Sequence, residues 1–283
     1  MDIIAPRIIA LLGPVLSVLV IGAGNARADS GNKIETSYEV NVGGLTVLDI
    51  KYSSEISAAG YRSQASIETR GMANFFSDYS MKMAASGALA GSQSSPLQYK
   101  SRREKKDKEK AFVLNWSQGV LSSADRQAAK NPEIQAEIDT ALTANVTDPL
   151  TAIFRIGTLP EGNPCQAAHR IFDGKEVFEL RFSFKGEAVL DDSFPGAYHG
   201  KAYECRATYV PVAGRYAVKF RKRNEEPPTY NVWLAPIGGD ASGGLRLVPV
   251  RATGRLDGLK FEAYASRVKI DGRPYKKNSV TVN

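Results

Sequence analysis

The feature that most constrains the fold of this chain is an apolar–polar alternation with a period of two, which recurs between residues 34 and 270. Its clearest instance is 178–184, where Phe and Leu at every second position alternate with Glu179, Arg181 and Ser183. Successive side chains of a strand point to opposite faces of a sheet, so the alternation indicates strands with one buried face. The same pattern predicts strands at 34–42, 48–52, 61–67, 112–117, 203–209, 215–221, 229–235, 245–251 and 259–270.

Dipeptides that end in glycine mark turns between several of these segments. Gly43-Gly44, Asp173-Gly174 and Asp257-Gly258 are typical of hairpins, because glycine adopts a positive φ without steric cost. Residues 86–95 are rich in Gly, Ala and Ser and predict a loop. Parallel strands need long crossovers, and few are available here, so we expect antiparallel pairing.

Helical signals are few. The best is 148–154, where Asp148 can cap the free amides, Pro149 suits the first helical position, and the apolar residues that follow share one stripe. A short helix is also predicted near 72–78, and 124–141 indicates either a helix or a mobile loop. We expect a mainly β fold in which a curved, half-barrel-like antiparallel sheet wraps around one or two short helices.

The N-terminal segment has the pattern of a secretory signal peptide. Arg7 supplies a positive charge, 8–22 is an apolar run interrupted by Pro14, and Ala26-Arg27-Ala28 fits a small-x-small cleavage site. The alternative is a membrane anchor, but the run is shorter than the ~20 residues that a bilayer requires. We therefore expect cleavage after Ala28, export to the periplasm and no transmembrane anchor after cleavage.

The expected domain organisation follows from that cleavage. Residues 1–28 are the signal peptide, and 29–283 are expected to form a single β-rich periplasmic domain with two lobes that join near 119–147. Lysine and arginine number 37 against 30 aspartates and glutamates, an excess of seven. Loss of residues 1–28 lowers that excess only to six, so the exported protein stays basic. A basic exported protein favours anionic envelope partners.

Cys165, His169, His199 and Cys205 are the only cysteines and histidines in the chain. Their spacing, Cys-x3-His and His-x5-Cys, admits a zinc site, but structural zinc sites usually have tighter spacings. An exported chain with two cysteines usually pairs them in its oxidising compartment. We therefore predict a Cys165–Cys205 disulfide and no metal centre, with zinc or free thiols as the alternatives.

Two stretches concentrate the basic residues. The stretch 100–110 is interrupted by acidic residues, which favours a solvated hairpin tip. The stretch 215–223 is more basic, and as a strand it would place four cations on its outer face, where they could attract lipid head groups or acidic glycans. These four residues are Arg215, Lys219, Arg221 and Arg223. The alternative is a solvated outer face, and nucleic acid is not an expected partner because no reading motif is present.

Enzyme motifs are absent from the chain. Neither Gly-x-Ser-x-Gly nor His-Glu-x-x-His occurs. A Ser/His/Asp set can still be assembled from distant residues, so a hydrolase with a dispersed site is kept as a less favoured alternative. We predict no catalytic residue and no cofactor.

The order of several short motifs resembles a known exported bacterial family. These motifs are Tyr38-Glu39-Val40, Gly43-Gly44-Leu45, Pro96-Leu97-Gln98-Tyr99, Asp148–Ala152, Phe172–Lys175, Tyr203–Arg206, Trp233–Pro236 and Leu247–Arg251. Together they are similar to the family called domain of unknown function 3108, over most of 34–268. The resemblance implies a β-rich fold and an exported protein but no established activity. By looser fold analogy, the chain is similar to periplasmic half-barrels that carry lipoproteins or other lipids.

We therefore expect a non-enzymatic periplasmic protein that binds a lipid-like or amphipathic envelope component or supports envelope integrity. Aromatic residues on the apolar strand faces would line the concave ligand-binding surface. They are Tyr38, Tyr52, Phe112, Trp116, Phe178, Phe182 and Tyr209. One alternative is that these aromatics only fill the core. Another is an interaction module that docks a protein or anionic envelope partner through its basic outer face.

Overall fold

The computed structural model describes residues 33–71, 78–90, 93–106, 108–160, 162–191, 197–237, 244–256 and 258–275. The signal-peptide prediction for 1–28 therefore lies outside the described residues, as does most of the helix predicted near 72–78. Within the described chain, no helix is long and apolar enough to span a membrane.

Strands dominate the structure, as the alternation predicts. They are β1 (Lys33–Val42), β2 (Leu45–Ser57), β3 (Gly60–Thr69), β4 (Tyr79–Ala90), β5 (Gln93–Lys105), β6 (Lys108–Ser117), β7 (Val120–Asp125), β8 (Ala167–Phe172), β9 (Val177–Leu190), β10 (Gly200–Ala213), β11 (Thr229–Pro236), β12 (Leu247–Leu256), β13 (Leu259–Ile270) and β14 (Arg273–Pro274). Three helices are described: α3 (Pro132–Leu142), α4 (Pro149–Gly157) and α5 (Arg215–Arg223).

The strands form one open antiparallel sheet. Its order is β7-β6-β5-β4-β3-β2-β1-β13-β12-β11-β10-β9-β8, with β14 added beside β13. Neighbours in the sheet are neighbours in the sequence except where β1 pairs with β13, with Ile34 opposite Ile270. This pairing joins the first seven strands to the remaining strands. The predicted fold class, a curved antiparallel sheet around short helices, is confirmed.

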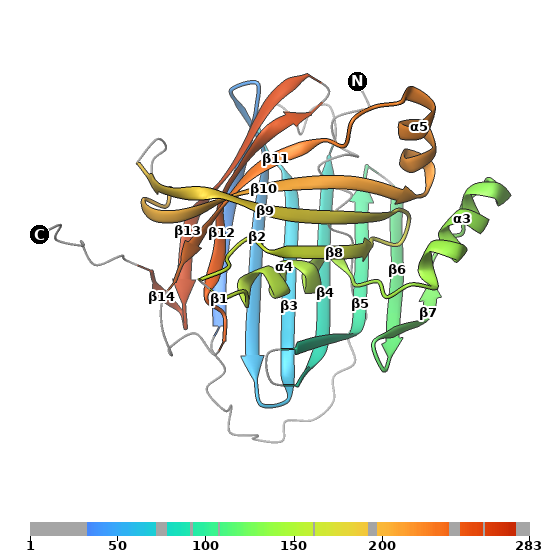
Figure 1. Cartoon of the computed structure of the whole chain (residues 1–283), viewed down its shortest axis with the longest axis horizontal. Helices are drawn as coiled ribbons and strands as arrows, with labels where there is room; N and C mark the ends of the chain where they lie inside the picture. The colour runs from blue at the N-terminus through green and yellow to red at the C-terminus, as the bar shows by residue number, and fades with distance from the viewer. Residues whose placement is uncertain are drawn as a thin grey trace, which may run out of the picture.

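The sheet curls so that its two ends face each other across α4. In Figure 1, β8, β9 and β10 cross in front of β2–β6, and α4 lies on the same side of these strands. Phe154 of α4 is fully buried, and its ring stacks on the ring of Tyr61 from β3 at 4.1 Å. The carboxylate of Asp148 accepts the backbone N–H of Thr151 at 2.9 Å, which confirms the predicted cap.

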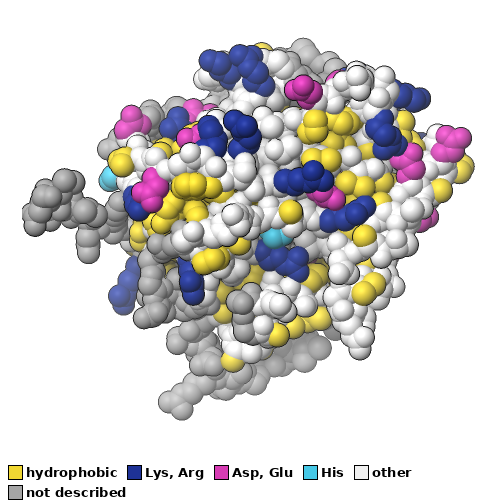
Figure 2. Space-filling model, in the orientation of Figure 1, with side chains coloured by type: hydrophobic (Ala, Val, Ile, Leu, Met, Phe, Trp, Pro, Cys, Tyr) yellow, Lys and Arg dark blue, Asp and Glu magenta, His cyan; other side chains and the backbone are white. Residues whose placement is uncertain are grey.

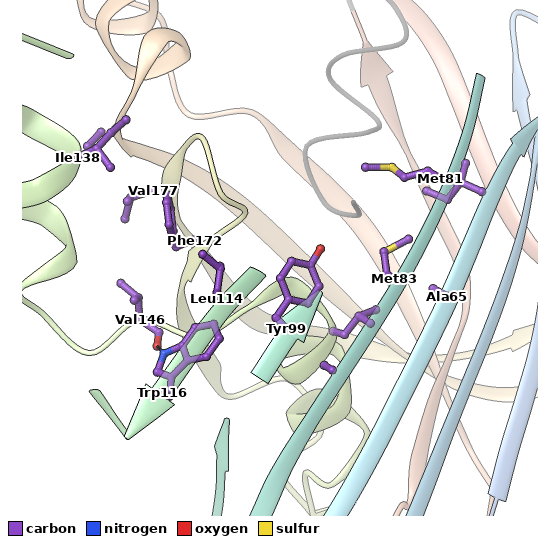
Figure 3. Packing of buried hydrophobic residues seen from close by; sticks show 14 of the residues in the cluster. Ala65, Met81, Met83, Tyr99, Leu114, Trp116, Ile138, Val146, Phe172 and Val177 are labelled. Atoms are coloured by element: carbon purple, nitrogen blue, oxygen red, sulfur yellow. Dashed lines mark hydrogen bonds between the residues drawn. The ribbon is translucent and has the colours of Figure 1, made fainter. Parts of the chain in front are cut away.

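A large apolar cluster fills the space between the two layers. Figure 3 shows Tyr99 and Leu114 of β5 and β6 close to Phe172 and Val177, which flank the β8–β9 turn. All four of these side chains are fully buried. Helix α3 closes this end of the cluster by packing on β9 and β10. The inner face of the sheet is thus a packed core.

Two local predictions are wrong. The first is the loop at 86–95, because β4 continues to Ala90 and β5 begins at Gln93. The small residues of this segment let it pack tightly as sheet, and a Cβ atom added at Gly87 would lie 2.3 Å from Cε1 of Tyr61.

The ambiguous segment 124–141 divides into the end of β7 and most of α3, which begins at Pro132 after a cap by Asn131.

The second wrong prediction is the strand at 215–221, which is part of helix α5. Tyr216 and Phe220 alternate like strand residues, but they are also one helical turn apart, and their rings lie 6.3 Å from each other. The carboxylate of Glu176 accepts the backbone N–H of Tyr216 at 3.1 Å, and Asn224 ends the helix with a φ of 50°. Because the Glu176 cap comes from a distant turn, the local pattern could not reveal it.

Candidate functional site

The aromatic residues predicted to line a ligand surface lie among the packed inner clusters. Trp116 and Phe178 are buried, and the indole N–H of Trp116 donates to the carbonyl of Val146 at 2.9 Å. Phe178 stacks on Tyr209 at 4.7 Å. The remaining members, Tyr38, Tyr52, Phe112 and Phe182, are partly buried and pack against the same core clusters. These contacts are those of core residues.

The two cysteines form the predicted disulfide. Cys165 and Cys205 are bonded, with their Cα atoms 5.6 Å apart and neither side chain exposed. The bond ties the segment before β8 to β10, across the intervening strand β9. It therefore holds the outer end of the sheet in register and leaves no free thiol in the described chain.

The buried polar groups beside α4 serve the fold. The Asp148 carboxylate accepts the hydroxyl proton of Thr151, and the Thr151 and Tyr61 hydroxyls lie 2.6 Å apart. Burial raises the pKa of Asp148 to about 6. On β8, burial and the nearby Arg155 lower the pKa of His169 to about 4, so the imidazole is neutral at pH 7. None of these groups opens into the groove described below.

The predicted basic patch lies on helix α5. Arg221 makes two hydrogen bonds with the carboxylate of Glu137 in α3, at 2.7 and 2.8 Å, and Arg223 pairs with Glu225 at 3.2 Å. Arg215 and Lys219 share the helix but not the outer face of a strand. Two of the four predicted cations are thus already engaged in ion pairs within the protein, and one of these pairs fastens α5 to α3.

A groove of about 520 Å³ lies on the opposite side of β1–β5 from α4. We call it the outer groove. In the orientation of Figure 1 it faces away from the viewer, behind the strands that α4 and β8–β10 cover. It crosses β13, β1, β2, β3, β4 and β5, which are consecutive in the sheet. Its outward side chains are Glu35, Ser37, Lys51, Ser53, Gln64, Ser66, Lys82, Ala84, Lys100, Arg267 and Lys269.

Strand register brings these residues together. Arg267 of β13 lies opposite Ser37, and Ser37 in turn lies opposite Lys51. Lys51 then faces Ser66, and Ser66 faces Lys82. Residues directly opposite each other share a face of the sheet. Cations and serines therefore alternate from strand to strand along one row of the outer groove.

A second row runs beside the first. It carries Lys269 at one end and Lys100 at the other, with Glu35, Ser53, Gln64 and Ala84 between them. The small side chains in the two rows leave a depression, because the longer cations stand at its ends and in its middle. The floor of the depression is backbone and serine hydroxyls, which are good hydrogen-bond partners for anionic oxygens.

The outer groove is strongly cationic. It has five lysines and arginines and a single carboxylate, Glu35, which already pairs with Lys33 at 2.9 Å. Within the described part of the chain, none of the five cations forms an ion pair. Like charges gathered in a depression raise the local potential and attract anions.

Several cations on other surfaces are paired with carboxylates. Figure 2 shows lysine and arginine beside aspartate and glutamate on the face that carries β8–β10. There Arg181 contacts Glu179 at 2.6 Å and Lys185 contacts Glu204 at 2.6 Å. On β2, beyond the edge of the outer groove, Asp49 pairs with Arg70 at 3.1 Å. The outer groove differs from these surfaces because it gathers five cations around one depression.

Sequence patterning alone did not reveal the outer groove. Its cations come from four strands and occupy polar positions that look like any solvated strand face. Only Lys100 falls in a stretch that the sequence marks as basic. The detectable signal is a lysine on the polar face of an alternating strand, as at Lys51 and Lys82, but the register that unites these positions is a property of the folded sheet.

Comparison with known proteins identifies a family. A search of curated proteins and a search of solved structures each found no match. A family model described as "Protein of unknown function (DUF3108)" matches residues 37–258, which include most of the outer groove but not Glu35, Thr36, Arg267 and Lys269. This match spans most of the chain and agrees with the resemblance seen in the ordered motifs. The chain therefore belongs to the DUF3108 family.

Proposed function

We propose that this chain is an exported, non-enzymatic protein of the bacterial envelope that binds an anionic envelope component in its outer groove. The observation that carries the proposal is the set of five cations around one depression, none of which pairs with a carboxylate among the described residues. An anionic ligand supplies the countercharge that the protein lacks there. The serines of the groove floor add hydroxyl groups that donate to phosphate or carboxylate oxygens.

The export part of the proposal rests on residues 1–28, whose pattern is that of a cleavable signal. The disulfide supports it, because such bonds persist in oxidising compartments such as the periplasm. Fractionation of the native host and N-terminal sequencing test it directly. The expected result is a periplasmic protein that begins at Asp29, and a cytoplasmic protein that retains Met1 would contradict it.

A lipid-like ligand on the inner aromatic face is the other function that the sequence suggested. Trp116 and Phe178 would have to leave packed, buried positions to admit it. The outer groove is open without any such rearrangement. The geometry thus supports an interaction module with an anionic partner more strongly than a lipid carrier, and native mass spectrometry of protein from its own host distinguishes the two.

Retention on phosphocellulose tests the anion-binding proposal. We expect the mature protein to bind at low salt and the variant Lys51→Ser/Lys82→Ser to elute at clearly lower salt, because both lysines stand in the middle of the outer groove. The matched control is Lys219→Ser/Lys222→Ser, which removes the same charge from helix α5. Equal elution of the two double variants would refute a role for the outer groove and attribute retention to net charge or to α5.

A further inference from the structure

We infer that the ligand of the outer groove is an extended linear polyanion that lies across the strands, from β13 to β5. This inference rests on the proposed function and adds the shape of the ligand. Three observations support it. They are the positions that the strand register gives the cations, the distances between these cations, and the lack of aromatic side chains that could stack on bases among the outward residues of the groove.

The cations are distributed along the whole groove. In the first row, Arg267, Lys51 and Lys82 occupy alternate strands, so their backbones are about 10 Å apart, since neighbouring strands lie about 4.8 Å apart. From β13 to β5 there are six consecutive strands, a span of about 24 Å. Lys269 and Lys100 stand at the two ends of that span in the second row.

A compact anion cannot use this arrangement. A single phosphate can be shared by neighbours such as Lys51 and Lys82, but it cannot also reach Arg267 and Lys100 at opposite ends. A chain with anionic groups at intervals engages all of them, and each added contact releases a counterion. The spread of unpaired charge thus matches a linear ligand better than a compact one.

The shape of the groove also argues against two other polyanionic partners. A bilayer surface is broad and flat, whereas the cations of the groove follow a narrow band of two adjacent rows across the strands. Single-stranded nucleic acid is usually held by aromatic side chains that stack on its bases. Among the groove-lining residues the only aromatic is Tyr52, whose ring belongs to the inner core cluster. The chemistry that remains is that of an acidic polymer recognised by charge and hydroxyl contacts.

Titrations at low salt with five probes test the inference. The probes are long-chain inorganic polyphosphate, pyrophosphate, polygalacturonate with its monomer, and vesicles that contain phosphatidylglycerol. At equal concentration of anionic groups, we expect a polymer to bind about tenfold or more tightly than its short counterpart. Whether polyphosphate or polygalacturonate binds more tightly identifies the preferred anionic group.

Variants of the groove ends show whether the whole span is used. Arg267→Ser/Lys100→Ser should weaken polymer binding about tenfold and leave pyrophosphate binding unchanged, because Lys51 and Lys82 remain. Lys219→Ser/Lys222→Ser on α5 is the charge-matched control and should leave both unchanged. Circular dichroism and thermal melting confirm that each variant is folded. Lys51→Ser/Lys82→Ser provides a second, independent test of polymer binding, at the middle of the groove.

The outcomes separate this inference from the function beneath it. Equal affinity for polymer and short anion, or a groove-end variant that binds polymer normally, would overturn the extended ligand but keep anion binding. Binding to vesicles without binding to either polymer would replace it with a membrane surface. Failure of every anion to bind would overturn the proposed function as well.

Discussion

The two faces of strands β1–β5 are built from alternate residues of the same segments, yet they differ in every physical respect. On the inner face, Tyr61, Ile67 and Tyr99 are almost fully buried and pack against α4 and the β8–β9 turn. On the outer face, Lys51 and Lys82 stand exposed around a depression. One face is filled by apolar side chains, and the other carries charged side chains with an excess of cations at the outer groove.

The inner face of these strands stabilises the protein, whereas the outer face is available to a partner. Apolar side chains on the inner face contribute to the free energy of folding because they leave water. Lysines gathered on the outer face repel one another and gain little from folding. A surface that keeps such a cluster is more readily explained by a ligand than by stability.

Truncation on the inner side should be the most damaging change. Phe154→Ala removes a fully buried ring that stacks on Tyr61, and we expect the free energy of unfolding to fall by about 3–5 kcal/mol. Urea denaturation followed by circular dichroism measures it. A reduction as small as that of a surface substitution would show that the space around α4 is not packed, and would revive a ligand cavity on the inner face.

A smaller effect is expected from the buried carboxylate that caps α4. Burial raises the pKa of Asp148 from 3.8 to about 6, so the folded protein holds this proton more tightly than the unfolded chain does. The resulting stabilisation is present below pH 3.8 and is lost as the pH rises through about 6. Asp148→Asn keeps a capping side chain but removes this titration.

The measurement is the unfolding free energy of the wild type and of Asp148→Asn between pH 3.8 and about 6. The wild type should lose stability relative to Asp148→Asn as the pH rises. Other groups with shifted pKa values, such as Glu176 and His169, are common to both proteins and cancel in the difference. Parallel pH profiles would mean that Asp148 is solvated and that the inner side near α4 is not closed.

The smallest effect on stability is expected in the outer groove. Lys51→Ser/Lys82→Ser removes two exposed cations without ion pairs, so the unfolding free energy should change by less than about 0.5 kcal/mol. The same denaturation assay measures it, with Phe154→Ala as the reference. A large destabilisation would mean that these lysines hold the sheet together, which would erase the contrast between the two faces.

Much of the inner side could be predicted from the sequence. Strand alternation located most strands, Asp148-Pro149 located α4, and the expectation of an oxidising compartment paired Cys165 with Cys205. The strands and α4 depend on local sequence patterns, and the disulfide depends only on the presence of two cysteines, which can pair in one way within the chain. The strand expected at 215–221 failed because an alternating segment of that length also satisfies a helix, and the deciding cap is Glu176, 40 residues away.

The outer groove could not be predicted in the same way. Lys51 and Arg267 are distant in sequence and meet only because β1 lies between β2 and β13. A shift of one residue in either pairing would move the side chains to the other face. The long-range β1–β13 pairing carries no local signature, so the site became visible only in the folded sheet.

The salt dependence of polymer binding shows whether Lys51 and Lys82 contact the anionic ligand. The affinity for long-chain polyphosphate is measured at several salt concentrations for the wild type and for Lys51→Ser/Lys82→Ser. If these lysines contact the ligand, the slope of log affinity against log salt should decrease in magnitude by about two, one for each lysine removed from the phosphates. An unchanged slope with unchanged affinity would show that the outer groove does not hold the anion, and would contradict the account.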